Sequence, residues 1–593
     1  MCKVQSSLLF LVLVAAAIPA DAQTYTVVYN FGTSSTSLTH PGSVIEDDEG
    51  NFYGVAAPPG PLGTGGSAIY KLAPPGTLTT LYSIPNSDGP VPGVTLGTDG
   101  NLYGVTSLGG TSANCPPGGP SDLPGGCGTV FKLTLGGTYS VLYNFDLTHG
   151  GVPGNPLTLG NDGNFYGSAG GGCCGVIFRV TPQGDYSVLH YFAVTDGNAP
   201  GPLMAIDGSL YGTTGTGGTN NTGTMFKITT AGQFTVLYDF GANISSNGEP
   251  VPSPYPLVQG QDGNFYGLAE PAGGNIYCDN GTCDCFAACG IVFKITPQGS
   301  FSVLYDFPGN PTTFPAITGG ALPYSLAQGT DDNLFGLAQG GTGCPQVEYG
   351  CGVLFQVTPS GAYSILYNLD YTHGSLPNPG PIRGGDGNYY GTTSEGGTGT
   401  AAVCQSTGGC GVFYALVVND FTVAASALKP STISPGASST STVNVAVVGG
   451  VSSAVALACS VQPTSAIAPK CSISPSSVTP GAASTLTVST IAPTMAGSPL
   501  SGRSGPFYGF WLLPAGLALA VVDLGSDRSK KLKMAALLLL VAVLLGLIFT
   551  VACGGGSTMS PSSQGTPAGT YTITVTGTSG FLLHSTTTTL TVQ

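Results

Sequence analysis

The sequence predicts an all-β protein: a seven-bladed β-propeller closed by its N-terminal strand, followed by an Ig-like β-sandwich that a helical membrane hairpin interrupts. Three observations support this fold class. A motif of the form Asp-Gly-Asn-x-Tyr-Gly occurs in seven copies. Strand-like pieces recur around each copy in a fixed order, and the incomplete units at the two ends of the repeat complement each other.

The motif is clearest at 162–167, which read Asp-Gly-Asn-Phe-Tyr-Gly. Asp-Gly and Asn favour the backbone angles of tight hairpin turns, so each copy predicts a turn between two antiparallel strands. The aspartates are interpreted as turn formers and not as calcium ligands, because a calcium loop needs several carboxylates over about a dozen residues. The other copies lie at 48–54, 99–104, 207–212, 262–267, 332–336 and 386–391.

Three further pieces accompany the motif. A short apolar run opened by Pro precedes it, as at 156–159, and two runs rich in β-branched and aromatic residues follow it, as at 175–181 and 186–192. Their alternation predicts four-stranded antiparallel meanders, which are the blades of a propeller. The repeat begins with a fourth-strand piece at 25–31, and its last unit lacks one. The N-terminal strand is therefore expected to complete the last blade and close the ring.

The loops of the predicted propeller divide between two faces, because successive strands reverse direction. The tight face carries the short first-to-second and third-to-fourth turns. The cysteine face carries the longer second-to-third and blade-to-blade loops, which hold every cysteine of the repeat. Functional residues concentrate on the variable loops of rigid scaffolds, so the cysteine face is the predicted binding face.

The cysteines are expected to form disulfides. Residues 1–22 combine a basic start, an apolar run and an Ala-Asp-Ala end, which is typical of a secretory signal peptide. Export leads to an oxidising compartment, where thiols pair. The candidates are Cys115, Cys127, Cys173, Cys174, Cys278, Cys283, Cys285, Cys289, Cys344, Cys351, Cys404, Cys410, Cys459 and Cys471, with Cys553 left over.

Two groups of these cysteines leave alternatives open. The four cysteines from Cys278 to Cys289 could hold zinc, but they lack paired C-x-x-C spacing and fit two local disulfides better. Cys173 and Cys174 could pair with each other or elsewhere, because connectivity is not readable from sequence. No metal and no cofactor is expected.

The motifs Asp-Gly-Asn-x-Tyr-Gly, Gly-x-x-Phe-Lys-x-Thr and Tyr-Ser-Val-Leu-Tyr-x-Phe, recurring in this order over 25–417, resemble the GloVer tandem repeat of bacterial surface proteins with a choice of anchor. The sixth copy departs from the pattern at 332–333, and Ser209 replaces Asn in the fourth. The resemblance implies an exported, anchored, propeller-like protein, and it brings no catalytic residues to this chain.

The C-terminal third is rich in Ser, Thr, Val and Ala and contains short strand-like runs, which predict a β-sandwich. It also resembles bacterial Ig-like modules. Two apolar runs interrupt it, and the basic residues 528–533 between them predict a hairpin whose loop lies in the cytoplasm. A single span or a processed tail are the alternatives. The predicted domains are the signal peptide 1–22, the propeller 23–418, the first sandwich part 419–490, the insertion 491–564 with membrane segments 507–522 and 534–552, and the last sandwich strands 565–593.

Charge and side-chain chemistry narrow the function classes. The net charge of −15 argues against nucleic acid as a partner, because phosphate binding needs clustered Lys and Arg. Three histidines in Thr-His sequences and two glutamates that follow second strands lie on the predicted cysteine face. They are candidate binding or acid/base residues, although the histidines could also be inherited with the repeat. These candidates are His40, His149, His373, Glu270 and Glu395.

Three functions remain open on this basis. The first is an exported, membrane-anchored cell-surface propeller that binds a glycan or a protein outside the cell. The second is a hydrolase or lyase of extracellular polysaccharide, with carboxylates at the central channel. The third is a structural scaffold. No nucleophile, nucleotide or dinucleotide motif occurs in a fitting context, so a binding module is expected rather than an enzyme.

Overall fold

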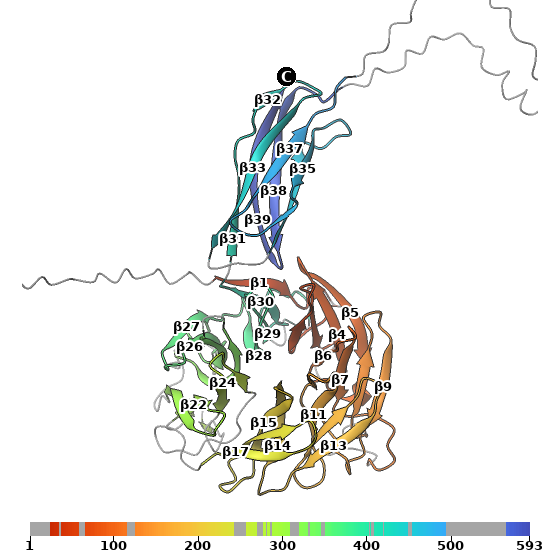
Figure 1. Ribbon diagram of the computed structural model, residues 1–593, viewed down its shortest axis with the longest axis vertical. Helices are drawn as coiled ribbons and strands as arrows, with labels where there is room; N and C mark the ends of the chain where they lie inside the picture. The colour runs from red at the N-terminus through yellow and green to blue at the C-terminus, as the bar shows by residue number, and fades with distance from the viewer. Residues whose placement is uncertain are drawn as a thin grey trace, which may run out of the picture.

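The structure, a computed structural model, forms a ring of seven four-stranded sheets with a two-sheet sandwich standing beside β1 and β30 (Figure 1). Successive strands of each sheet run antiparallel, and in Figure 1 the strands β5, β9 and β13 lie at the outer edge of the ring. The structure describes residues 24–593 except 35–36, 59–65, 116–124, 242–256, 270–276, 280–281, 285–287, 309–318, 330–331, 345–349, 403, 405–407, 419, 449–453 and 494–564.

Each blade begins with a strand at the centre of the ring and a second strand joined to it by the Asp-Gly-Asn turn. The first strands are β2 (Val44–Glu46), β6 (Val94–Leu96), β10 (Thr158–Leu159), β14 (Asn198–Ile206), β18 (Val258–Gln259), β24 (Ala321–Gln328) and β28 (Ser375–Arg383). The second strands are β3 (Phe52–Ala56), β7 (Leu102–Thr106), β11 (Phe165–Ala169), β15 (Ser209–Thr216), β19 (Phe265–Ala269), β25 (Leu334–Gln339) and β29 (Tyr389–Glu395).

The outer half of each blade consists of a third and a fourth strand. The third strands are β4 (Ser67–Ala73), β8 (Thr129–Leu133), β12 (Val176–Val180), β16 (Thr224–Thr229), β22 (Ala288–Ile295), β26 (Val353–Val357) and β30 (Val412–Val417). The fourth strands are β5 (Thr77–Ile84), β9 (Tyr139–Asn144), β13 (Tyr186–Tyr191), β17 (Phe234–Asp239), β23 (Phe301–Pro308), β27 (Tyr363–Asn368) and β1 (Thr24–Asn30). The loops add a 3-10 helix (Asn86–Asp88) and the short strands β20 (Tyr277–Asp279) and β21 (Thr282–Asp284).

The N-terminal strand completes the last blade. β1 pairs antiparallel with β30, from Thr24 opposite Val417 to Asn30 opposite Val412. This pairing is the closure expected from the incomplete units at the two ends of the repeat. It joins the first and last parts of the propeller by backbone hydrogen bonds and pairs the edge of β30 that would otherwise be free.

The core lies between neighbouring blades. The second strands are buried along most of their length, because both of their faces pack against adjacent sheets. The motif residue Tyr103 of the second blade stacks on Phe165 of the third, with ring centroids 4.0 Å apart. Both rings are fully buried, which confirms that the repeated aromatic residues form the blade core.

The sandwich packs two sheets around one hydrophobic core that includes Phe421, Leu486 and Ile573. This core joins residues from both parts of the predicted sandwich, while the domain boundaries themselves stay a prediction. One sheet contains β31 (Asp420–Ala425), β33 (Ser438–Val448), β37 (Ala483–Ser489) and β35 (Lys470–Ser474). The other contains β32 (Thr432–Ile433), β39 (Leu582–Val592), β38 (Gly569–Ser579), β34 (Val455–Gln462) and β36 (Ser477–Val478).

The helical membrane hairpin is wrong as part of this fold class. The described residues form an all-β structure of propeller blades and a sandwich, and none of the helices among them is long and apolar enough to cross a membrane. The two apolar runs, 507–522 and 534–552, lie outside the described residues. An apolar run of about 20 residues permits a spanning helix without dictating one.

Candidate functional site

The turns of the tight face are held by hydrogen bonds within the motif itself. Asp162 accepts hydrogen bonds from the Tyr166 hydroxyl at 2.7 Å and from the Asn164 side-chain amide at 2.8 Å. Partial burial alone would raise the pKa of Asp162, but these hydrogen bonds lower it overall. The carboxylate is occupied inside its own turn, which confirms that the motif aspartates are turn formers. The same arrangement occurs at Asp99, Asp262 and Asp386.

The first copy of the motif uses a different aspartate from the one that its sequence suggests. Asp47, and not Asp48, accepts hydrogen bonds from the Tyr53 hydroxyl at 3.0 Å and from the Asn51 side-chain amide at 2.9 Å. Glu49 stands directly before the turn glycine, where the second copy has Asp99. The carboxylate that caps this turn therefore comes from two residues earlier in the chain.

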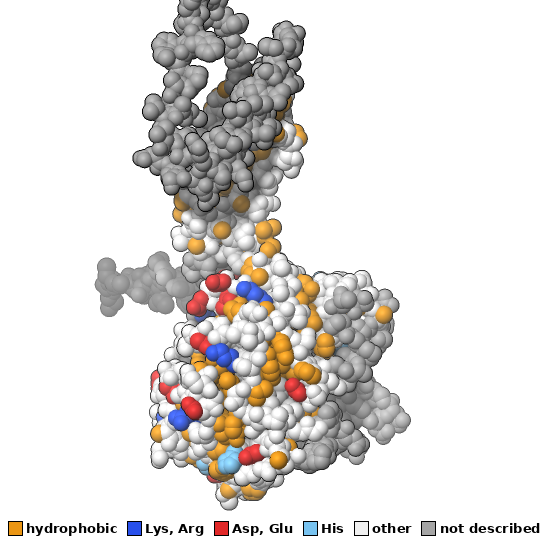
Figure 2. All heavy atoms as spheres, turned by 90° about the vertical axis from the view of Figure 1, so that its right-hand side faces the viewer, with side chains coloured by type: hydrophobic (Ala, Val, Ile, Leu, Met, Phe, Trp, Pro, Cys, Tyr) orange, Lys and Arg blue, Asp and Glu red, His pale blue; other side chains and the backbone are white. Residues whose placement is uncertain are grey.

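Lysine side chains of the third strands pack over the tyrosines of the tight-face motif. Lys132 Nζ lies 2.8 Å from the Asp99 carboxylate and 5.3 Å from the centre of the Tyr103 ring. Lys71, Lys227 and Lys294 lie over motif tyrosines in the same way. In Figure 2 the Lys and Arg side chains of the propeller lie toward its left-hand side, beside acidic ones. None of the second-to-third and blade-to-blade loops contains Lys or Arg in the sequence, so the cysteine face does not favour anionic polymers.

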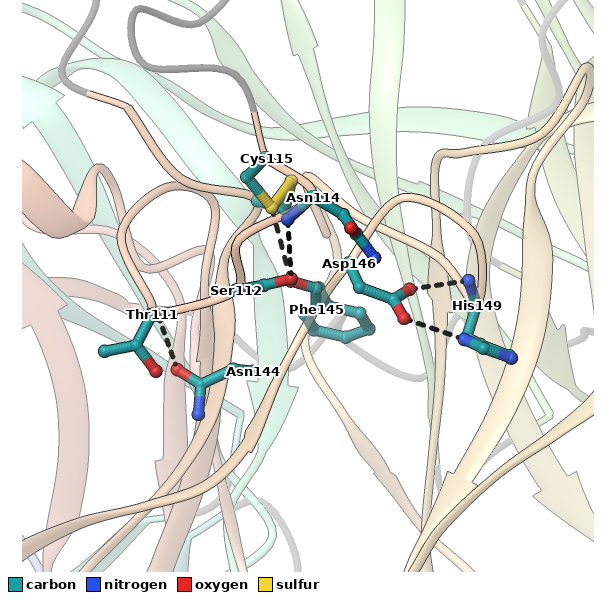
Figure 3. Close-up of a disulfide and its surroundings, with 9 residues drawn as sticks. Thr111, Ser112, Asn114, Cys115, Asn144, Phe145, Asp146 and His149 are labelled. Carbon is teal, nitrogen blue, oxygen red and sulfur yellow. Dashed lines mark hydrogen bonds and ion pairs between the residues drawn. A yellow bond between two sulfur atoms is a disulfide. The ribbon is translucent and has the colours of Figure 1, made fainter.

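Disulfides hold the second-to-third loops of the cysteine face. Figure 3 shows one of them beside Phe145, which follows the outer strand of the same blade. Cys115 Sγ lies 3.4 Å from the Phe145 carbonyl oxygen, and the Asn144 side chain accepts a hydrogen bond from the Thr111 backbone. The loop is thereby fixed to its own blade. The described bridges are Cys115–Cys127, Cys344–Cys351 and Cys404–Cys410 in the propeller and Cys459–Cys471 in the sandwich.

These bridges confirm the predicted disulfides among eight of the candidate cysteines and indicate an oxidising, extracellular environment. Cys173 and Cys174 are free thiols in this structure. The side chains of Cys278, Cys283, Cys285, Cys289 and Cys553 lie outside the described residues, so their pairing stays a prediction.

Two of the predicted histidines form the same local arrangement in different blades. His149 Nδ1 lies 2.8 Å from the Asp146 carboxylate, and Figure 3 shows the two side chains turned toward each other beside the disulfide. His373 Nδ1 lies 2.8 Å from Asp370. Burial opposes ionisation of Asp146, but its hydrogen bonds with His149 lower the pKa of the carboxyl overall. Each imidazole side chain is about half exposed.

Tyrosines of the neighbouring blade hold these histidine loops in place. The Tyr186 hydroxyl donates a hydrogen bond to the His149 carbonyl, and the Tyr25 hydroxyl donates one to the His373 carbonyl at 2.7 Å. Each loop is therefore closed by an Asp–His hydrogen bond within it and attached to the next blade through a tyrosine. Such a loop is ordered before any ligand arrives.

His40 is not equivalent to the other two histidines. It occupies a position just before a first-strand proline, where other blades have Val152, Ala199, Leu322 and Leu376, all with positive φ. Its backbone N–H donates to the Cys410 carbonyl at 2.8 Å, as that of Val152 donates to Cys127. Burial lowers the pKa of the His40 imidazole. The residue fills a structural position between two blades and presents no polar edge to the surface.

The two predicted glutamates have different outcomes. Glu270 lies outside the described residues, so the suggested acid and base pair stays a prediction. Glu395 lies on the cysteine face of the last blade, where burial raises the pKa of its carboxyl. Gly408 lies close to both Glu395 and Tyr371. A Cβ on this glycine would be 3.3 Å from the Glu395 carboxylate and 3.6 Å from the Tyr371 ring. Glu395 and the exposed Tyr371 thus approach each other near His373.

The seven first strands, which surround the centre of the ring, contain few charged residues. Among the seven first strands, the charged residues are Glu46 and Arg383, and both lie at the tight-face ends of their strands. Neutral side chains of these strands bind the neighbouring blade instead, as when Thr158 donates to the Leu203 carbonyl at 2.7 Å. These hydrogen bonds join neighbouring blades around the centre of the ring.

A cleft of about 530 Å³ lies between the tight face and the sandwich, a feature that sequence reasoning missed. Burial raises the pKa of Glu46 in this cleft to about 7, the backbone N–H of Gly385 counteracts the rise, and Asp386 and Asp47 add to it. The lining residues come from around positions 46, 386 and 580. No pattern in the sequence links these three segments, so only the assembled fold brings them together.

The fold and its two unlike faces define the protein as a disulfide-bearing β-propeller joined to a β-sandwich. Residues 120–344 match the family model described as the Gloeobacter/Verrucomicrobia repeat, which confirms the resemblance seen in the motifs. The chain has no significant match among curated proteins.

Several solved structures are similar to this chain. A luciferin-regenerating enzyme is 10% identical, with 66% of this chain and 94% of that chain covered and a TM-score of 0.32. A protein from Lactobacillus plantarum is 13% identical, with 59% and 96% covered and a TM-score of 0.37. A gluconolactonase from Xanthomonas campestris is 12% identical, with 54% and 89% covered and a TM-score of 0.30. Similarities of this size carry no argument about activity.

Proposed function

We propose that this protein is an exported binding propeller whose cysteine face recognises a neutral glycan. The observation that carries the proposal is the chemistry of that face. Its loops contain no Lys or Arg in the sequence, and they are attached to the blades by disulfides and hydrogen bonds. A rigid surface of this kind loses little conformational entropy on binding.

Exposed tyrosines support a glycan as the first ligand to test. The Tyr371 side chain is 42% exposed and lies between Asp370 and His373 on one loop. Tyr191 is 52% exposed, and both Tyr191 and Asp146 help to raise the pKa of Tyr143, so both lie near that residue. An aromatic face can pack against a sugar ring, while Asp and His exchange hydrogen bonds with its hydroxyl groups. Two such groups in different blades suit an extended chain with repeating units.

A pull-down of the full chain on cellulose, chitin and xylan tests the proposal. The wild-type protein is expected to bind at least one polymer, and the double variant Tyr371→Ala/His373→Ala to bind that polymer at least tenfold more weakly. Gln183→Ala changes an exposed residue of the tight face and serves as the matched control, with binding expected to equal the wild type. Retention of the double variant at wild-type strength, or capture of culture proteins with none of the polymers retained, would contradict the proposal.

A further inference from the structure

The second-to-third loop of the third blade, 170–175, carries two adjacent cysteines. Cys174 directly precedes the glycine that opens the third strand, as Cys127, Cys351 and Cys410 do in their blades. Its carbonyl accepts a hydrogen bond from the Ala199 backbone at 3.1 Å, and the carbonyl of Cys127 accepts one from Val152 at 2.7 Å. Cys174 therefore occupies the position of the downstream cysteine of a blade disulfide.

Cys173 occupies the position of the upstream partner. Its Sγ lies 3.5 Å from the Phe192 carbonyl oxygen, and Cys115 Sγ lies 3.4 Å from the equivalent oxygen of Phe145. In the fourth blade, which has no cysteine, the Thr222 hydroxyl donates to the corresponding carbonyl of Phe240. The position beside this carbonyl is thus filled by a sulfur or a hydroxyl in each of these blades.

We propose that Cys173 and Cys174 are a redox modification site that closes to a vicinal disulfide in the exported protein. The bridges described on this face join cysteines 12, 7 and 6 residues apart, and the loop of the third blade is too short for such spacings. Adjacent cysteines place both sulfurs where the longer loops place theirs. Gly171 and Gly172 have positive φ and give this loop the backbone freedom that a small ring requires.

The chemistry is a thiol–disulfide exchange with an oxidised disulfide donor. The thiolate of Cys173, which is exposed, attacks one donor sulfur, and the other donor sulfur leaves as a thiol. The thiolate of Cys174, which is buried, then attacks the Cys173 sulfur and releases the second donor thiol. Two protein thiols are oxidised to one disulfide, and the donor disulfide is reduced to two thiols.

Mass spectrometry of the full chain after incubation with oxidised glutathione tests this proposal. Without reduction, the peptide that contains both cysteines is expected to take up no iodoacetamide and to be lighter than the dithiol by two hydrogen atoms. After dithiothreitol, it is expected to take up one alkyl group on each cysteine. Alkylation of both cysteines without reduction, or a bridge from either one to another peptide, would overturn the proposal.

The variant Cys174→Ser tests the order of attack. It removes the buried thiol and is expected to trap glutathione on Cys173 as a mixed disulfide, because no neighbouring thiol can displace it. Cys173→Ser is the matched variant and is expected to carry far less glutathione, since the remaining thiol of Cys174 is only 4% exposed. Equal trapping in the two variants, or none on Cys173, would contradict the assignment.

Discussion

The two glycines of the repeated motif have different physical roles. Gly163 has φ +77°, and a Cβ there would meet nothing within 4 Å, so its backbone conformation alone favours glycine. A Cβ at Gly167 would overlap the ring of Phe178, which lies over it. The corresponding glycine of every other blade lies under a Phe or Tyr ring of the third strand in the same way: Gly54, Gly104, Gly212, Gly267, Gly336 and Gly391.

Alanine substitutions separate these two roles. Gly163→Ala is expected to lower the free energy of unfolding by about 1 kcal/mol, the cost of placing a Cβ in the left-handed region. Gly167→Ala is expected to lower it by about 3 kcal/mol, because the Phe178 ring must move within a packed core. Urea unfolding of the full chain measures both values. Equal losses would show that the ring contact does not select glycine at 167.

Single residues could be predicted where their role is local. The hydrogen bonds of Asp162 join residues within one turn, so the motif pattern alone indicates what this aspartate does. The different positions of His40 and His149 could not be predicted, because they depend on the register of a blade-to-blade loop. Both are preceded by Thr in the sequence, yet one follows an Asp-x-x turn and the other precedes a first-strand proline.

Stacked aromatic rings join the outer strands of neighbouring blades. A ring near the end of one fourth strand lies parallel to a ring at the start of the next, as for Tyr143 and Tyr186, whose centroids are 3.7 Å apart. This stacking explains why fourth strands such as β9, β17 and β27 carry aromatic residues at their first and fifth positions. The stacked pairs are Tyr82–Tyr139, Tyr143–Tyr186, His190–Phe234, Tyr238–Phe301, Tyr305–Tyr363 and Tyr367–Tyr25.

A double-mutant cycle on Tyr143 and Tyr186 measures the strength of one such stack. We expect a coupling energy of about 1 kcal/mol between Tyr143→Ala and Tyr186→Ala in chemical unfolding, which is the usual value for an aromatic pair beyond its buried area. Val141→Ala on the same strand, with its side chain 45% exposed, is the control and is expected to change stability little. A coupling energy of zero would mean that the stacked rings do not act together.

The strands of the blades could be predicted because the same pattern occurs many times, so a weak signal in one unit is supported by the others. The sandwich and the apolar insertion have no such repetition. There the prediction of a membrane hairpin rested on the length of two apolar runs and on the basic residues between them, and it was wrong. Phe581, between β38 and β39, packs against aromatic rings of the propeller. The sequence could not predict this contact, because a single Phe in a Thr-rich stretch does not indicate its partner.

The junction between the last and first blades is built differently from the others. Leu78 stands where the other outer strands begin with an aromatic ring. At this junction the sandwich places Phe581 5.5 Å from Phe52, 5.7 Å from Tyr390 and 5.5 Å from Phe413, between ring centroids. The sandwich therefore packs across the two blades that close the ring and adds apolar contacts to the pairing of β1 with β30.

The carboxyl of Glu46 in the cleft beside this contact makes stability depend on pH. Its pKa is raised from 4.5 to about 7, chiefly by burial, so the folded protein holds this proton more tightly than the unfolded chain. The stability that the protonated Glu46 carboxyl contributes to the folded protein is fully present below pH 4.5 and is lost as the pH rises to about 7. The melting temperature of the wild type should therefore fall over this pH range relative to that of Glu46→Gln, whose side chain does not ionise.

The wild type and Glu46→Gln differ at one position only. The effects of the other titrating groups therefore cancel in the difference between the two melting temperatures. If the difference in melting temperature between the wild type and Glu46→Gln stayed constant from pH 4.5 to 7, the cleft would not hold Glu46 in its protonated form. A difference that changed in the opposite direction would show that the ionised carboxylate is stabilised there.

The tight face of the propeller builds the blades and contacts the sandwich, whereas the cysteine face is the proposed ligand-binding face. Hydrogen–deuterium exchange of the full chain, with and without soluble xylo-oligosaccharides and chito-oligosaccharides, tests this division most directly. The predicted result is slower exchange at 144–151 and 369–376 with at least one of the two probes, and no change at 162–167. Protection of the Asp-Gly-Asn turns, or no protection of either loop with either probe, would contradict it.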